Sequence, residues 1–79
     1  MEKSEIIKKV NAVLAEEFEV EESIITPEAN IKKTLQLDSL SLVDMVVLIE
    51  SEFGVKIQPA ELVKVQTFEA LYDYLAEKL

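Results

Sequence analysis

The amino-acid sequence predicts an all-α fold: a bundle of four helices, three long and one short, with a long loop between the first two. Glycine and proline are scarce, at 1 and 2 of 79 residues, which disfavours a turn-rich β fold. Apolar residues make up 49% of the chain and recur at helical spacing in three segments. We expect a single domain over residues 1–79, because so short a chain supports only one hydrophobic core.

The first predicted helix covers residues 3–17, with Ser4 as a candidate N-cap. Residues 19–37 form a long connection that is acidic in its first half. Within it, Thr26 and Pro27 are predicted to start a short turn of helix. Because a loop of this length is unusual in a small domain, apolar anchors should hold it against the core. The anchors are Ile24, Ile25, Ile31, Leu35 and Leu37.

The second long helix is predicted over residues 39–53. Asp38 precedes it as a natural N-cap, and Gly54 follows it as a natural terminator. Residues 55–57 should be extended.

The short helix is predicted over residues 59–63, because Pro59 suits a first helical turn. Thr67 should cap the last helix, which runs to Leu79. Its buried face is predicted to comprise Phe68, Leu71, Tyr72 and Leu75.

The charge balance narrows the possible partners. There are 16 acidic and 8 basic residues, and the net charge is −8. Such a surface repels nucleic acids and anionic membranes and attracts basic protein surfaces. A simpler interpretation is that the charge only maintains solubility. No segment reaches the roughly 18 apolar residues of a membrane span, and the start lacks a signal-peptide core. We therefore expect a cytoplasmic monomer.

The sequence lacks the residues that most catalytic and metal sites need. It contains no histidine, cysteine or arginine. A serine nucleophile requires a base, and zinc sites use histidine and cysteine ligands. We therefore expect no catalytic residues and no metal site, and an esterase that uses Ser39 is the least favoured of the functions considered.

Asp38 and Ser39 stand together at the predicted start of the second long helix. The N–H groups and the dipole of a helix N-terminus favour an attached phosphate, although the negative charge of Asp38 opposes it. The alternative is an ordinary helix start with no function.

The same helix has two apolar faces. At about 100° per residue, one stripe faces the core and a second lies on the side of Ser39, flanked by Asp44 and Glu50. The second stripe is predicted to dock basic partner surfaces, or alternatively to pack on the short third helix. The core stripe comprises Leu42, Met45, Val46, Ile49 and Phe53, and the second stripe comprises Leu40, Val43 and Val47.

In these features the chain resembles the acyl carrier protein family over nearly its whole length. The segment Asp38-Ser39-Leu40 resembles the attachment motif of that family, and Val43-Asp44 resembles its valine–acid pair. Further similarity lies in Glu50, Glu52 and Phe53, in residues 54–57 with Pro59, and in Thr67 with residues 71–75.

The resemblance implies a 4′-phosphopantetheine arm on Ser39, installed from coenzyme A by a phosphopantetheinyl transferase. The thiol of the arm would carry acyl groups as thioesters between fatty-acid or polyketide synthesis enzymes with basic docking surfaces. It also implies an acyl pocket, for which we predict a lining of Leu42, Val46, Leu62 and Tyr72.

Three departures from the family pattern keep a second interpretation open. Gln36-Leu37 replaces the usual Gly-Ala, Ser41 stands where an acid is common, and Ser51 interrupts an acidic run. They weaken the match to the housekeeping fatty-acid carrier, so a specialised carrier of polyketide-like, aryl or aminoacyl groups is the alternative within the family. An unmodified acidic helical adaptor is the alternative from a different class.

Overall fold

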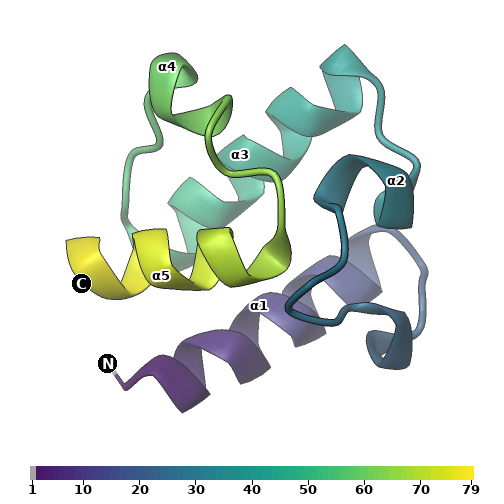
Figure 1. Ribbon diagram of the computed structural model, residues 1–79, viewed down its shortest axis with the longest axis horizontal. Coiled ribbons are helices and arrows are strands. Elements are labelled where there is room, and N and C mark those ends of the chain that lie inside the picture. Colours follow the sequence, from purple (N-terminus) through teal and green to yellow (C-terminus); the bar gives the residue numbers. More distant parts are fainter. Residues whose placement is uncertain (1) are drawn as a thin grey trace.

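The computed structural model describes residues 2–79, and all their side chains except those of Ser39 and Pro59. The fold is all-α, as predicted (Figure 1). In chain order the elements are α1 (Lys3–Glu17), the 3₁₀ helix η1 (Glu22–Ile24), α2 (Ile31–Leu35), α3 (Ser39–Phe53), α4 (Pro59–Leu62) and α5 (Phe68–Lys78).

The core lies between the three long helices. α1 and α5 pack side by side, and α3 lies behind them (Figure 1). The inward stripe of each helix supplies the most deeply buried side chains, which explains why an apolar period of 3.6 residues predicts all three. These side chains are Ile6, Val10, Leu14, Met45, Ile49, Phe68, Leu71, Tyr72 and Leu75.

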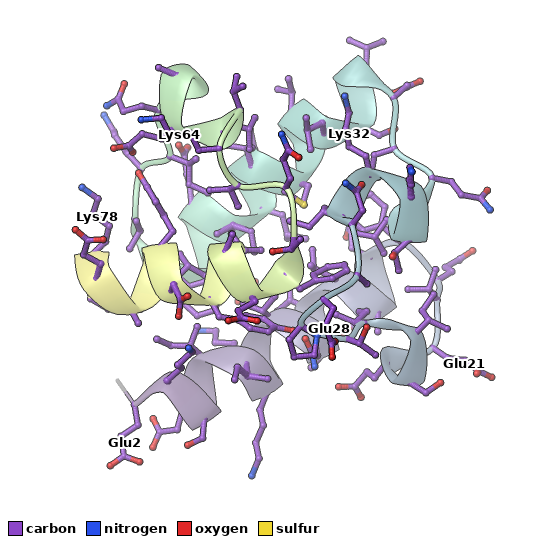
Figure 2. The ribbon with its side chains drawn as sticks, viewed as in Figure 1. Glu2, Glu21, Glu28, Lys32, Lys64 and Lys78 are labelled. Atoms are coloured by element: carbon purple, nitrogen blue, oxygen red, sulfur yellow. The ribbon has the colours of Figure 1, made fainter. Side chains whose placement is uncertain are left out.

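Charged side chains lie at the periphery of the molecule. Glu2, Glu21, Glu28, Lys64 and Lys78 are all exposed (Figure 2). No polar or charged side chain is buried among those that the structure describes. The core therefore depends on apolar packing, and the excess negative charge lies at the surface.

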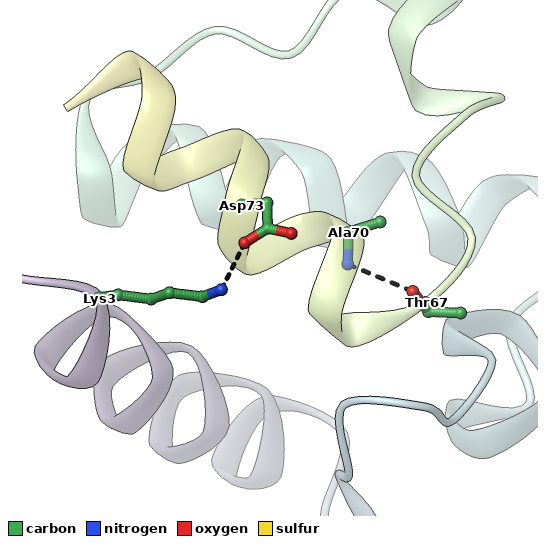
Figure 3. A network of polar contacts seen from close by, with 4 residues as sticks. All are labelled: Lys3, Thr67, Ala70 and Asp73. Carbon is green, nitrogen blue, oxygen red and sulfur yellow. Dashed lines mark hydrogen bonds and ion pairs between the residues drawn. The ribbon is translucent and has the colours of Figure 1, made fainter.

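Three helix boundaries follow the predicted local signals. At the start of α3, the Asp38 carboxylate accepts a hydrogen bond from Ser41 N–H at 2.8 Å. At the start of α5, Thr67 Oγ1 accepts a hydrogen bond from Ala70 N–H at 3.2 Å (Figure 3). Gly54 ends α3 in the left-handed conformation, with φ +69°. Side-chain caps replace hydrogen bonds that the first turn of a helix lacks. In the same view Lys3 on α1 forms an ion pair with Asp73 on α5.

Two other predicted helix starts are wrong. α1 begins at Lys3, after Glu2, so Ser4 is not its N-cap. Thr26 and Pro27 form a non-helical turn closed by Ala29 N–H and the Thr26 carbonyl.

The long connection instead forms α2, whose start is capped by Asn30 through Lys33 N–H at 3.0 Å. Backbone hydrogen bonds hold this part of the chain to the start of α5. Ile31 N–H donates to the Gln66 carbonyl at 2.9 Å, and Phe68 N–H donates to the Ala29 carbonyl at 3.3 Å. We call residues 27–31 and 66–69 the paired segments. Together with the paired segments, the buried anchors Ile25, Ile31, Leu35 and Leu37 hold the long connection in place. Ile24, the fifth predicted anchor, is 43% exposed, so that prediction is wrong.

None of the helices in residues 2–79 combines the length and the apolar character that a membrane crossing requires.

Candidate functional site

The site begins at the N-terminus of α3, where Asp38 is the cap and Ser39 is the first helical residue. The side chain of Ser39 lies outside the part of the chain that the structure describes. The hydrogen bond from Ser41 N–H lowers the pKa of Asp38, so its carboxylate is ionised at neutral pH. Any second anion placed at this helix end therefore meets both a favourable dipole and an unfavourable neighbour.

An apolar strip runs along α3 from this point. Leu40, Val43 and Val47 expose 78%, 55% and 57% of their surface. More than half of the surface of each side chain is exposed, so packing on α4 does not cover this strip. We call these three residues the outer strip. The opposite stripe is buried at Met45, Ile49 and Phe53, as the helical wheel predicts.

The two acids beside the outer strip have different surroundings. Asp44 is exposed. Glu50 is only partly exposed, and its Oε1 accepts a hydrogen bond from Ile57 N–H at 3.1 Å. Glu50 therefore fastens the extended segment after α3 to the helix. The helical wheel places Glu50 beside the outer strip. It cannot show that the segment after α3 folds back so that Ile57 reaches the Glu50 side chain.

A cavity of about 380 Å³ lies beside the first turns of α3. Leu42 from α3 and Leu62 from α4 line it, and both are among the residues predicted for an acyl pocket. The described lining is completed by Val63, Asn30, Lys32 and Gln66. Its wall is thus apolar on the side of α3 and α4 and polar on the side of α2 and the paired segments.

Two residues predicted for the pocket lie elsewhere. Val46 packs partly buried against the core and is not among the described residues that line the cavity. Tyr72 is 1% exposed, and its hydroxyl donates to Asn11 Oδ1 on α1. This burial raises the pKa of Tyr72. Tyr72 therefore belongs to the packing of α5 on α1.

The polar lining residues carry no signal in the sequence that marks them in advance. Asn30 and Gln66 reach the cavity because the paired segments bring two distant parts of the chain together. A non-local backbone pairing of this kind leaves no periodicity to detect.

Known proteins are similar to this chain in both sequence and fold. Residues 8–75 match the family model described as the phosphopantetheine attachment site. The acyl carrier protein of Thermotoga maritima is 43% identical over 77 residues, which cover 98% of this chain and 95% of that protein. The acyl carrier protein of Petrotoga mobilis is 40% identical over 79 residues, with coverage of 100% and 93%.

A solved structure, that of the acyl carrier protein from Enterococcus faecalis, matches the fold with a TM-score of 0.83. It is 32% identical and covers 100% of both chains. The matched region of the family model includes α3 and every described residue that lines the cavity. The chain therefore belongs to the acyl carrier protein family of non-catalytic carriers with a phosphopantetheine attachment site.

Proposed function

We propose that Ser39 carries the 4′-phosphopantetheine arm and that the protein presents acyl intermediates of fatty-acid or related biosynthesis to partner enzymes. The observation that carries this proposal is the position of Ser39 as the first residue of α3, directly after an Asp38 cap and three residues before Leu42, which lines the cavity. When bound, the arm supplies the thiol that a chain without cysteine lacks.

The described residues fit such an arm. Leu42, Leu62 and Val63 offer an apolar wall to an acyl chain, which favours burial in proportion to the area removed from water. Asn30 and Gln66 offer amide groups to the polar part of an arm. The cavity volume lies within the range of small-molecule pockets.

We further propose that the outer strip and Asp44 form the surface that partner enzymes recognise. A narrow exposed apolar patch beside an acidic group suits a partner surface with an apolar centre and basic rim. The net charge of −8 would steer such partners, including the phosphopantetheinyl transferase. In this proposal residues 1–79 act as one monomeric carrier domain in the cytoplasm.

Intact mass spectrometry tests the attachment site. Incubation with coenzyme A and a phosphopantetheinyl transferase should add the mass of one phosphopantetheine. Ser39→Ala should abolish the addition. Ser41→Ala is the matched control, because it removes a serine hydroxyl from the same helical turn and should leave loading intact. An unmodified wild-type chain after treatment with several transferases would rule the proposal out and favour the unmodified adaptor.

A specialised carrier of polyketide-like, aryl or aminoacyl groups is the second candidate. The polar side of the cavity favours it, since Asn30, Lys32 and Gln66 suit cargo that contains hydrogen-bonding groups. Loading by an aryl or amino-acid ligase, with no loading by a fatty-acyl ligase, would establish this candidate over the fatty-acid carrier.

A further inference from the structure

Lys32 on α2 is the single charged side chain among the described residues that line the cavity. Figure 2 shows it extending from α2 toward the end of the molecule where α3 begins. The described side chains contain one ion pair, between Lys3 and Asp73, so Lys32 has no described carboxylate within ion-pair distance. A cation is thus placed at an otherwise uncharged cavity without a partner in the described protein.

The backbone fixes Lys32 close to the start of α3. Its carbonyl accepts hydrogen bonds from the N–H groups of Gln36 and Leu37, the latter at 2.9 Å. Leu37 lies two residues before Ser39 in the chain. Leu42, three residues after Ser39, lines the same cavity as Lys32. Lys32 therefore lies on the side of α3 from which an arm on Ser39 would reach the cavity.

Negative charges at the N-terminus of α3 would make a lysine at this position favourable. The ionised carboxylate of Asp38 already occupies the N-terminus of α3. A phosphodiester on the next residue adds a second negative charge, within a protein whose net charge is −8. A nearby cation on the cavity side would relieve this repulsion and favour arm conformations that lie over the cavity.

We infer that Lys32 is a positioning residue that binds the phosphodiester of the arm on Ser39 and so holds the loaded arm over the cavity. The inference rests on the proposed attachment at Ser39. It adds that the contact with Lys32 sets the fraction of time for which the cargo lies sheltered over the cavity. The phosphodiester is the favoured anion because every loaded form contains it, whatever its cargo.

The test compares the wild-type protein with Lys32→Met, Lys32→Arg and Lys33→Met, each loaded with an octanoyl arm. Met retains the stem of lysine and removes its charge. Lys33 is the matched control, because it is exposed, follows Lys32 on α2 and is not among the described lining residues. Intact masses confirm equal loading, and thermal unfolding confirms that each variant folds.

Two measurements report on the arm. The first is the rate at which hydroxylamine cleaves the octanoyl thioester. Lys32 is exposed, so Lys32→Met should raise this rate about two- to fivefold, the upper part of the range for exposed ion pairs. Lys32→Arg and Lys33→Met should retain the wild-type rate. The second is the phosphorus-31 resonance of the arm, which should move with added salt in the wild type but not in Lys32→Met.

Three outcomes would overturn the inference. Lys32→Met could match the wild type in both measurements. Lys33→Met could reproduce the effect of Lys32→Met, which would indicate that the overall charge of α2 matters and not the position of Lys32. Alternatively, Lys32 could matter only for a dicarboxylic half-thioester of the same length, which would identify the cargo as the anion. In all three cases the proposed attachment stands. If the wild type accepts no arm, both proposals fail together.

Discussion

The hydroxyl of Tyr74 on α5 donates a hydrogen bond to the carboxylate of Glu61 on α4. It also lies 3.3 Å from the carbonyl of Lys56, in the segment that leads to α4. The bond to Glu61 raises the pKa of Tyr74, so the hydroxyl keeps its proton well into the alkaline range. Because Leu62 of α4 lines the cavity, this contact fastens one wall of the site to a long helix.

Tyr74→Phe should loosen α4 and leave the three long helices in place. The ring is retained and only the hydroxyl is lost, so the melting temperature should fall by no more than a few degrees. Hydrogen exchange should accelerate at the amides of residues 59–65 and not in α1. Tyr72→Phe is the comparison, since its hydroxyl bonds to Asn11 on α1 and its loss should leave α4 exchange unchanged. Uniform acceleration over the whole chain in Tyr74→Phe would contradict a local role.

Substitutions of Glu50 and Asp44 should have different effects, because we expect Glu50 to support the fold and Asp44 to bind partners. Glu50→Ala removes the acceptor for Ile57 N–H and should lower the free energy of unfolding by about 1–2 kcal/mol. Asp44→Ala should leave stability nearly unchanged, because that side chain is exposed, but should weaken binding to a basic partner enzyme. Urea unfolding and a binding titration measure the two effects. Equal stability losses in both variants would contradict this division.

Asp38 should give the protein an acid-sensitive component of stability. Its folded pKa lies below the ordinary value of about 3.9, so its contribution is complete above that value and is lost as the pH falls through the folded pKa. Asp38→Asn retains a capping oxygen that does not titrate. Melting temperatures measured from neutral to strongly acidic pH should therefore decline less steeply in the variant than in the wild type. Parallel curves would show that other carboxylates govern acid unfolding.

Gly54→Ala should cost about 1 kcal/mol of unfolding free energy through backbone conformation alone. Gly54 has φ +69°, where a Cβ atom is disfavoured, and an added Cβ would meet no atom of a more distant part of the chain within 4 Å. Gly54→Asn should cost less, because asparagine tolerates the left-handed conformation better. Urea unfolding of the three proteins measures the order. A loss for asparagine as large as that for alanine would refute the conformational explanation.

Local signals in the sequence predict much of this fold. Asp38, Gly54 and Thr67 mark helix ends because each acts on atoms within a few residues of itself. The three long helices follow from apolar periodicity, which also predicts the exposed outer strip.

Features that depend on distant parts of the chain escape such signals. α2 starts after Asn30, where residues 27–31 meet residues 66–69, and Thr26-Pro27 wrongly suggests an earlier start. Tyr72 shares the apolar period of α5, but only the packed structure shows that it faces α1. Periodicity therefore cannot predict which residues line the cavity.

The paired segments have a consequence for how this site can change over generations. Their contacts are made between main-chain N–H and carbonyl groups, as in the hydrogen bond from Ile31 to Gln66. Main-chain contacts persist when side chains are exchanged. The side chain of Gln66 can therefore be replaced without breaking the backbone pairing, and the same holds for Lys32, whose carbonyl accepts from Gln36 and Leu37. Substitutions can therefore change the chemistry of the cavity lining while the backbone that carries it stays the same.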